Sequence, residues 1–413
     1  MHYFEYKKGE LYCEDVALKD LAENVGTPTY IYSQKTIERH FQAYQSGFQN
    51  TDHLICYSVK ANSNLSILRL LGEMGAGFDI VSQGELYRVL QAGCDPKKVV
   101  FSGVGKTQTE MAYALDHNIL SFNVESEQEL KVLNAIAKEK NKKAPVSLRV
   151  NPDIDPKTHP YISTGLKKNK FGIPMEEAKS IFKNLAQYPN IQFMGMDCHI
   201  GSQMLSLDPI LETVRELKKL ILDLKTHGIE IRHLNLGGGL GISYTTETPP
   251  SPQEYLKEVL KELEDLHLKI LIEPGRSIMG NAGILLTQVL YTKTNTSKNF
   301  VIVDAAMNDL IGPTLYQAHQ DIWPVAGEKR SMTTVDIVGP ICESGDFLGQ
   351  DRDLPELKSK DLLAIMGAGA YGFTMSSNYN SRPRVAEVLV LGETYKVIRK
   401  RETLEDLIRG ESL

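Results

Sequence analysis

His53-Leu54-Ile55-Cys56-Tyr57-Ser58-Val59-Lys60 is a short, mostly apolar run that ends on a lysine, and it is the first of eight such segments. Each segment is bounded by Gly, Pro, Asn or Ser, and nearly all of them end in a residue type that chemistry can use. Runs of this kind are typical of parallel strands buried on both faces. The other seven segments are Gly77–Ser82, Lys98–Gly103, Leu120–Glu125, Pro145–Pro152, Phe193–Gly201, Arg232–Gly238 and Lys269–Arg276.

Helix-like stretches lie between these segments, with apolar residues at three- and four-residue intervals and with Ser126, Asp208 and Ser251 placed to cap three of them. Strand then helix, repeated eight times over about 240 residues, predicts a (β/α)8 barrel. An open, doubly wound sheet has the same alternation, so the residues at the strand ends must decide between the two. The clearest helices are expected at 82–92, 126–140, 174–186, 208–227 and 251–266.

A different pattern follows Arg276, where alternating apolar and polar runs are separated by turn residues. The run Thr29-Tyr30-Ile31-Tyr32 precedes the barrel and is expected to complete the same sheet. We therefore predict an α/β protein: a TIM-like (β/α)8 barrel at residues 30–280, and a mostly antiparallel β domain formed by residues 1–29 and 281–413. The runs after the barrel are 284–291, 300–304, 334–338, 362–366 and 385–391.

Composition narrows the class of protein. The 413 residues are 42% hydrophobic and 24% charged, with a formal net charge of -6, which is typical of a soluble globular protein and argues against general affinity for nucleic acid or anionic membrane. No apolar run approaches ~18 residues and no signal-peptide pattern opens the chain, so we expect a cytoplasmic protein. The five cysteines form no CxxC pair, which argues against a disulfide framework or a metal site.

Two strand ends suggest a phosphate-bearing aldehyde as ligand. Lys60 would present a partly desolvated amine at the barrel mouth, and desolvation makes a lysine a better nucleophile. The seventh segment ends in the glycine loop, defined here as Leu236-Gly237-Gly238-Gly239-Leu240-Gly241, whose bare N–H groups can bind phosphate. A surface lysine and a plain tight turn explain these two features equally well when each is taken alone.

Further polar residues end the remaining segments. Glu273 could keep a ring nitrogen protonated, and His199 could stack on the ring, although a strand-end salt bridge and a packed histidine are the simpler explanations. Convergence of so many polar groups on one rim favours a common ligand, and together they suggest pyridoxal phosphate. The other groups aimed at this rim are Asp79, Arg149, Ser202 and Arg276.

The chain resembles the pyridoxal-phosphate decarboxylases of the alanine racemase fold over nearly its whole length, and among them most closely the diaminopimelate decarboxylase family. No shuffled barrel would carry these motifs in this order. The motifs are Tyr57–Asn62, Gly77–Leu86, Ser163–Lys167 with Asn169–Gly172, His199–Gln203, the glycine loop, Glu273–Arg276, Cys342–Asp346 and Gly369–Gly372.

The resemblance implies decarboxylation of meso-diaminopimelate to L-lysine and carbon dioxide in a homodimer with shared active sites, to which the β domain contributes. It implies Lys60, Cys342 and His199 as catalytic residues, with Cys342 and Glu343 reaching in from the partner chain. It implies that the substrate is held by Arg276, Tyr316, Glu343 and Tyr371. The implied cofactor-binding residues are Lys60, Asp79, Arg149, His199, Ser202, Gly238, Gly239, Glu273, Gly275, Arg276 and Tyr371.

One position departs from the family pattern. In the segment Asn308–Tyr316, relatives that use diaminopimelate place an arginine where this chain has Gly312. An arginine–carboxylate fork is a strong, directional contact that glycine cannot replace. The departure leaves open a related decarboxylase for another amino acid, either from a siderophore or antibiotic pathway or of the ornithine or arginine type.

Other members of the fold fit the sequence less well. An alanine racemase would pair the ring nitrogen with an arginine, where this chain has Glu273. An ornithine- or arginine-type enzyme would carry an aspartate beside the cysteine, where this chain has Glu343. A non-catalytic cofactor carrier would have no use for Cys342, Glu343 or a second domain.

Overall fold

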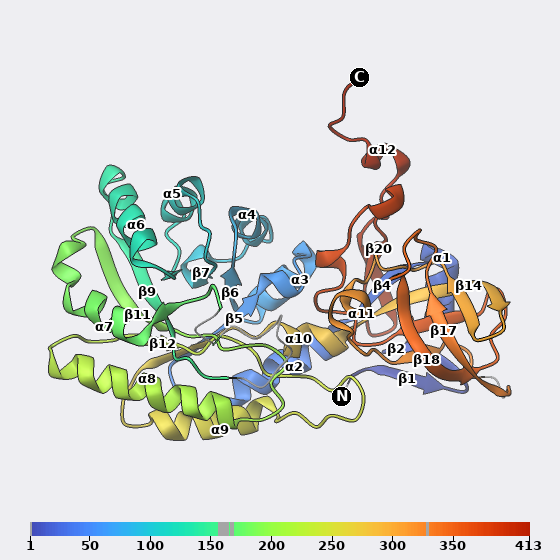
Figure 1. Cartoon of the computed structure of the whole chain (residues 1–413), viewed down its shortest axis with the longest axis horizontal. Helices are drawn as coiled ribbons and strands as arrows, with labels where there is room; N and C mark the ends of the chain where they lie inside the picture. The colour runs from blue at the N-terminus through green and yellow to red at the C-terminus, as the bar shows by residue number, and fades with distance from the viewer. Residues whose placement is uncertain (1, 156–164, 166–168, 328–329) are drawn as a thin grey trace. The chain divides into compact units, whose positions relative to one another are not determined.

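The computed structural model describes residues 2–155, 165, 169–327 and 330–413 and divides the chain into two compact units (Figure 1). The barrel unit comprises Phe41–Ile242 and Thr248–Ser277. The β unit comprises Met1–His40, Ser243–Glu247 and Ile278–Leu413. The domain limits predicted at residues 30 and 280, and the role of the β domain in a dimer interface, stay predictions.

Eight parallel strands form a closed ring in the barrel unit, because β13 pairs with β5 and β8 pairs with β9. The predicted (β/α)8 barrel is therefore confirmed, and an open sheet is excluded. Each strand overlaps one of the eight predicted segments, although β9 begins one residue and β11 two residues before its segment. A short strand, β10 (Ile173–Pro174), pairs with β9 beside the ring. In ring order the strands are β5 (His53–Ser58), β6 (Gly77–Ile80), β7 (Val99–Phe101), β8 (Ser121–Val124), β9 (Ala144–Asn151), β11 (Ile191–Asp197), β12 (His233–Asn235) and β13 (Lys269–Ile272).

Helices alternate with these strands and lie around the ring (Figure 1). Ser126 and Ser251 accept backbone N–H bonds at the starts of α6 and α9, so both predicted caps are confirmed. The cap predicted at Asp208 is wrong, because Asp208 is itself the first residue of α8, and Ser206 Oγ accepts its N–H at 3.2 Å. The helices are α2 (Gln34–Gly47), α3 (Leu65–Glu73), α4 (Gln83–Gln91), α5 (Gln108–Asp116), α6 (Glu127–Glu139), α7 (Met175–Lys183), α8 (Asp208–Thr226) and α9 (Pro252–Leu263).

The β unit contains a large sheet with the strand order β18-β17-β15-β14-β4-β20-β21, and β19 joins it through β14 and β16. Most neighbours are antiparallel, as predicted, but β15–β17 and β4–β20 are parallel. Strand β4 (Thr29–Ser33) lies between β14 and β20, so the N-terminal segment completes the sheet. The other strands are β14 (Gly283–Thr294), β15 (Asn299–Val303), β16 (Ile322–Pro324), β17 (Met332–Val338), β18 (Phe347–Pro355), β19 (Leu362–Ile365), β20 (Ala386–Leu391) and β21 (Thr394–Arg399).

The described part of the chain also contains a second, three-stranded sheet and four short α-helices. Apolar residues of this small sheet, such as Phe4 and Leu11, pack with Ile31, Ile284 and Val388 in one hydrophobic core of the β unit. The small sheet is β1 (Phe4–Lys7), β2 (Glu10–Cys13) and β3 (Val16–Ala17), and the helices are α1 (Leu18–Val25), α10 (Arg276–Met279), α11 (Gly312–Tyr316) and α12 (Leu404–Leu407).

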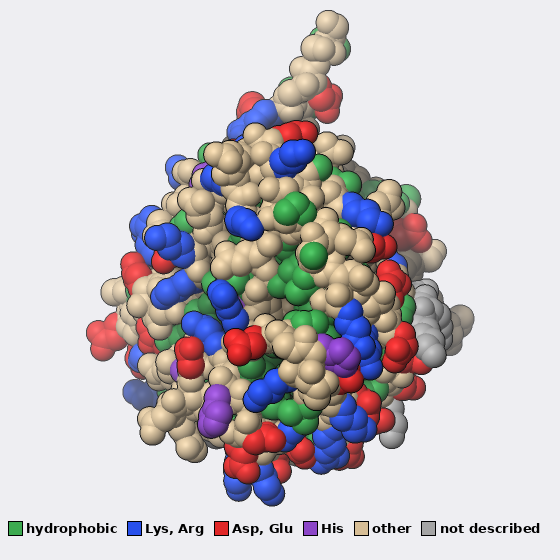
Figure 2. All heavy atoms as spheres, turned by 90° about the vertical axis from the view of Figure 1, so that its left-hand side faces the viewer, with side chains coloured by type: hydrophobic (Ala, Val, Ile, Leu, Met, Phe, Trp, Pro, Cys, Tyr) green, Lys and Arg blue, Asp and Glu red, His purple; other side chains and the backbone are tan. Residues whose placement is uncertain are grey.

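The surface carries charges of both signs. On the face shown in Figure 2, Lys and Arg side chains are interspersed with Asp and Glu, and hydrophobic side chains are visible among them. This face therefore does not have the uniformly positive field that attracts nucleic acid or an anionic membrane. Across the described parts of the chain, no helix combines the length and apolar character that a membrane span requires.

Candidate active site

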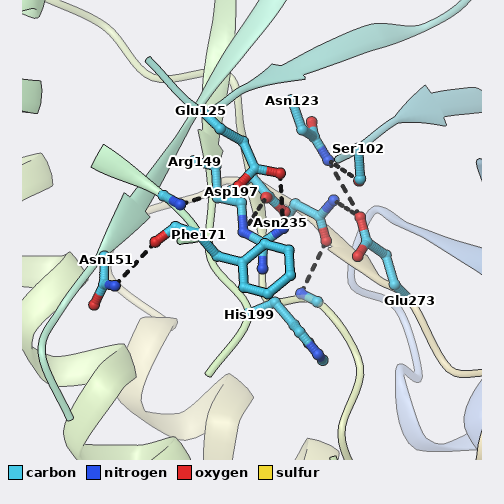
Figure 3. A network of polar contacts seen from close by, with 12 residues as sticks. Ser102, Asn123, Glu125, Arg149, Asn151, Phe171, Asp197, His199, Asn235 and Glu273 are labelled. Atoms are coloured by element: carbon cyan, nitrogen blue, oxygen red, sulfur yellow. Dashed lines mark hydrogen bonds and ion pairs between the residues drawn. The ribbon is translucent and has the colours of Figure 1, made fainter. Parts of the chain in front are cut away.

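Strand register brings polar side chains to one level at the carboxyl ends of the barrel strands. Arg149 of β9 lies opposite Asp197 of β11, and Asp197 lies opposite Asn235 of β12. Figure 3 shows these side chains close together, with Glu273 beside Asn235. Enzymes built on a (β/α)8 barrel bind their ligands at the carboxyl ends of the strands, so this level is the candidate active site.

Lys60 lies at this level, in a short 3-10 turn directly after β5. Its Nζ lies 2.6 Å from Oδ2 of Asp79, a fully buried carboxylate of β6. Ser58 Oγ donates to the same oxygen at 3.0 Å, because Ser58 and Asp79 are register partners. The amine therefore lies beside a buried carboxylate that accepts its hydrogen bond.

Glu273 follows β13 and is only 6% exposed. Its Oε1 accepts hydrogen bonds from Nδ2 of Asn235 at 2.6 Å and from Nδ2 of Asn123 at 3.2 Å. Burial, and then the nearby carboxylates of Asp79 and Asp197, raise the pKa of Glu273 well above its usual value. A cation or protonated nitrogen at this position would relieve that crowding of negative charge.

Arg149 is buried rather than open at the mouth. Its Nη1 lies 3.0 Å from Oε1 of Glu125 and its Nε lies 3.8 Å from Oδ2 of Asp197, while the guanidinium stacks over the Phe171 ring at 5.0 Å. Asp197 Oδ1 is buried with no hydrogen-bond partner among the residues described. The predicted role of Arg149 in cofactor binding stays a prediction, and its visible partners are these two carboxylates.

His199 lies next to the glycine loop. Its Nδ1 accepts a hydrogen bond from the N–H of Gly238 at 3.2 Å. Burial lowers the pKa of His199 well below its usual value, with the positive charges of Arg149 and Lys60 acting in the same direction. His199 is therefore a neutral imidazole with its proton on Nε2, and such a ring can stack on an aromatic ligand without adding charge.

The glycine loop is joined to the segment that carries Ser202. The N–H of Met204 donates to the carbonyl of Gly239 at 2.9 Å, and the N–H of Gly241 donates back to the carbonyl of Met204 at 3.0 Å. The Gln203 amide adds two bonds to Ile242, with lengths of 2.6 and 3.1 Å. These bonds place Ser202 and the glycine loop side by side.

Only glycine fits the centre of this loop. A Cβ on Gly238 would lie 2.3 Å from the carbonyl oxygen of Glu273. A Cβ on Gly239, whose φ is +115°, would lie 2.3 Å from the carbonyl oxygen of Gly201. The loop thus presents backbone without side chains, and with the Lys60 amine and the Glu273 carboxylate it fits an aldehyde that carries a phosphate and a ring nitrogen.

The segment after Glu273 turns directly into α10. Gly275 is buried, and Arg276 is the first residue of that helix and half-buried. Arg276 therefore leaves the same strand end as Glu273. A guanidinium there could hold a carboxylate of a ligand bound at this level.

Comparison with known proteins agrees with this geometry. The model of the family described as "Pyridoxal-dependent decarboxylase, pyridoxal binding domain" matches residues 34–280. The chain is 55% identical to the diaminopimelate decarboxylase of Vibrio cholerae, covering 100% of this chain and 99% of that protein. It is 54% identical to the same enzyme of Pseudomonas aeruginosa, with 100% and 99% covered.

The chain belongs to the diaminopimelate decarboxylase family. The expected resemblance and the expected cofactor, pyridoxal phosphate, are therefore confirmed. The fold is also similar to the crystal structure of the Helicobacter pylori diaminopimelate decarboxylase complexed with L-lysine. That structure has a TM-score of 0.92 and 46% identity, with 95% of this chain and 98% of that chain covered.

The resemblance to diaminopimelate decarboxylases also implies four site residues that belong to the β unit: Tyr316, Cys342, Glu343 and Tyr371. Cys342 and Glu343 are both exposed in the loop between β17 and β18. The hydroxyl of Thr314 donates to the carbonyl of Gly345 at 2.6 Å, so α11, which ends at Tyr316, lies beside this loop. Tyr371 has a left-handed backbone with φ 56°. Part of one motif, residues 163–164 and 166–167, lies outside the described residues.

Sequence reasoning missed several buried polar residues of this diaminopimelate decarboxylase site. Asn123, Glu125, Asp197 and Asn235 were given no role, although all four lie within or directly after barrel strands. The available signal was a polar side chain inside an otherwise apolar strand, because burying such a group requires a partner. Their partners lie far away in sequence, so the pattern alone could not identify the contacts.

Proposed function

We propose that this chain decarboxylates meso-diaminopimelate to L-lysine and carbon dioxide, as a pyridoxal-phosphate-dependent carboxy-lyase of lysine biosynthesis in the cytoplasm. The observation that carries the proposal is the grouping of Lys60, buried Glu273 and the glycine loop at one barrel mouth. Full-length identity of 55% to a diaminopimelate decarboxylase supports the substrate. The Helicobacter pylori relative, solved with L-lysine, supports the product.

When bound, pyridoxal phosphate supplies an electron sink for the bond electrons released as carbon dioxide leaves. Lys60 Nζ is the group that would bind the aldehyde carbon, and Asp79 Oδ2, 2.6 Å away, would hold that nitrogen in position by accepting its hydrogen bond. Ser58 fixes the position of that carboxylate oxygen.

Glu273 would bind the ring nitrogen and keep a proton on it. His199, neutral and buried, would pack on the ring face without competing for that proton. Together these residues would keep the ring nitrogen protonated, which is the charge state that decarboxylation requires. Asp79 adds negative charge close to Glu273, which favours a protonated ring further.

The phosphate would be bound by Gly238, Gly239 and Ser202, with Tyr371 as a further donor. Support comes from the bonds that join the Ser202 segment to the glycine loop and from the lack of space for any side chain there. Backbone N–H groups and a hydroxyl are suitable donors to a phosphate dianion.

For the substrate, we propose that Arg276 holds one carboxylate, with Tyr316 and Tyr371 as further contacts. Cys342 Sγ would deliver the proton that replaces carbon dioxide, and Glu343 would bind the distal ammonium. Both would come from the partner chain of a homodimer. The exposure of Cys342 and Glu343 on one turn-rich loop supports this role, because neither side chain is used within its own unit's core.

We propose that substrate binding is weakened at one position, Gly312, where relatives that use diaminopimelate have an arginine. Among the described residues, a Cβ there would lie within 4 Å of Ala318 Cβ alone, at 3.9 Å, so the backbone at this position can carry a side chain. Losing one charge-assisted contact should reduce substrate affinity by about ten- to a hundredfold. Because the relatives at 55% and 54% identity are diaminopimelate decarboxylases, we propose the same substrate here, bound less tightly.

The test is to incubate the purified protein, reconstituted with pyridoxal phosphate, with meso-diaminopimelate and to measure lysine and carbon dioxide. We expect both products in equal amounts. Ornithine, arginine and lysine serve as competing substrates in parallel reactions. Faster carbon dioxide release from any of these would show that this amino acid is the preferred substrate. No release from any of the four would contradict the proposal that the protein is a decarboxylase.

A further inference from the structure

Two asparagine amides converge on one oxygen of Glu273, and no role described above uses them (Figure 3). Nδ2 of Asn235 donates to Oε1 at 2.6 Å, and Nδ2 of Asn123 donates to the same oxygen at 3.2 Å. All three residues are buried. Within the described part of the chain, Oε2 of Glu273 accepts no hydrogen bond.

The two amides reach Glu273 from different walls of the barrel. Asn235 ends β12, which pairs directly with β13, while Asn123 belongs to β8, four strands away in the ring of eight. Asn123 therefore crosses the barrel interior to reach a residue 150 positions later in the sequence. A carboxylate held from both sides cannot rotate freely about its last bond.

The orientation of each amide is also fixed. Oδ1 of Asn235 accepts the N–H of Gly237 at 3.0 Å, so its NH2 group must face Glu273. Nδ2 of Asn123 donates a second bond, to Ser102 Oγ at 3.1 Å, while its Oδ1 is buried with no partner among the described residues. Turning either amide over would place two oxygens against each other.

These contacts oppose the electrostatics of the site. Burial and the neighbouring carboxylates of Asp79 and Asp197 favour a protonated Glu273, whereas donors to Oε1 favour the ionised form. A neutral carboxyl would carry its own hydrogen and would bind a protonated ring nitrogen poorly. The amides offset only part of that effect, and the pKa of Glu273 stays raised, so their clearer consequence is geometric: they occupy Oε1 and leave Oε2 without a donor among the described residues.

We propose that Asn123 and Asn235 are positioning residues that occupy Oε1 of Glu273 and so leave Oε2 to bind the ring nitrogen of the cofactor. This inference rests on the proposed function, in which Glu273 binds that nitrogen. Neither asparagine touches the reacting atoms. Their effect passes through Glu273 alone.

The test compares two ligands on full-length protein freed of its cofactor: pyridoxal phosphate and its 1-deaza analogue, which has carbon in place of the ring nitrogen. Wild type, Asn235→Leu and Asn123→Leu are titrated with each ligand. Leucine has the same branched skeleton as asparagine and removes the donors. Ser121→Ala is the matched control, because Ser121 lies on the same strand as Asn123 and loses a buried bond to Ser147 Oγ of 3.0 Å without touching Glu273.

We expect wild type to prefer pyridoxal phosphate over the analogue, and Asn235→Leu to reduce that preference about tenfold. Asn123→Leu should reduce it less, because its bond to Glu273 is longer. Ser121→Ala should leave it unchanged. Equal weakening of both ligands in the asparagine variants would reveal a merely structural role and overturn the inference, as would an unchanged preference.

A folding check and a replacement variant keep the result decisive. Circular dichroism checks folding, and if Asn235→Leu does not fold, Asn235→Ser, whose hydroxyl is too short to reach Glu273, takes its place with the same expectation. A wild type without any preference would contradict the role of Glu273 in the proposed function. A wild-type preference that both asparagine variants retain would contradict only the role of the amides.

Discussion

At the scale of single residues, the barrel mouth is dominated by buried carboxylates with few cations among them. Asp79 pairs with Lys60, and Glu125 and Asp197 lie beside Arg149, so the hydrogen-bond partners of the Glu273 carboxylate among the described residues are amides. A carboxylate without a cationic partner in a buried site is costly unless a charged ligand binds to it. The protonated ring of the cofactor has the charge that this position lacks.

Restoring the missing arginine is the first prediction. Gly312→Arg should lower the apparent KM for meso-diaminopimelate about ten- to a hundredfold, because it returns a charge-assisted contact to the substrate carboxylate. Steady-state kinetics on the purified variant measures the change. Gly312→Gln, which adds a polar but uncharged side chain, is the control and should leave KM close to the wild-type value. An arginine variant that behaves like the glutamine variant would show that position 312 does not face the substrate.

At the scale of elements, the glycine loop is the most constrained segment of the site. Gly239→Ala should weaken binding of pyridoxal phosphate roughly tenfold or more, because a Cβ would lie 2.3 Å from the Gly201 carbonyl at a φ of +115°. Absorbance titration of cofactor-free protein gives the affinity. Gly105→Ala has no atom within 4 Å of its Cβ and should bind the cofactor as wild type does. If both variants bind alike, the loop does not hold the phosphate.

Strand β12 supplies a pH-dependent contribution to stability through His233. Burial, followed by the charge of Lys269, lowers the pKa of His233 from 6.5 to about 4, and its Nε2 lies 2.6 Å from Ser147 Oγ. The unfolded chain then binds more protons between these two values, so stability falls as the pH drops from about 6.5 towards 4, by roughly 3 kcal/mol in all. The free energy of unfolding should therefore decrease over this interval.

Urea unfolding at pH 7, 6 and 5 measures this dependence. His233→Gln should show a shallower decrease than wild type, because the titrating group is gone. His227→Gln is the control, since His227 is exposed just after α8. Equal slopes for wild type and His233→Gln would assign the pH dependence to other groups.

The sequence predicted the elements of the barrel well, for a physical reason. Strands buried on both faces are mostly apolar, so each stood out as a short run, and a functional group such as Lys60 or Glu273 ended that run. The bond between Asn123 and Glu273 could not be predicted, because it joins residues 150 positions apart across the ring. Parallel pairing of β4 with β20 was missed for the same reason.

At the scale of the whole molecule, the proposed active site needs two chains. If Lys60 and Cys342 come from different subunits, mixing the inactive variants Lys60→Ala and Cys342→Ala should restore activity. Random exchange makes half of the dimers hybrids with one intact site each, so we expect about a quarter of wild-type activity. The measurement is lysine production after mild unfolding and refolding of the mixture.

The control for this mixing experiment pairs Lys60→Ala with Glu273→Gln. Both residues lie in the barrel unit, so no hybrid contains an intact site and no activity should return. Recovery with the control pair, or none with the Cys342 variant, would contradict a shared active site.

The central claim is that pyridoxal phosphate is bound covalently by Lys60. Borohydride reduction of the holoenzyme, followed by proteolysis and mass spectrometry, tests it most directly. We predict one modified peptide, with the cofactor mass on Lys60, and loss of the visible absorbance of the bound cofactor. Modification of a different lysine, or a colourless protein without any modified peptide after reconstitution, would contradict the account.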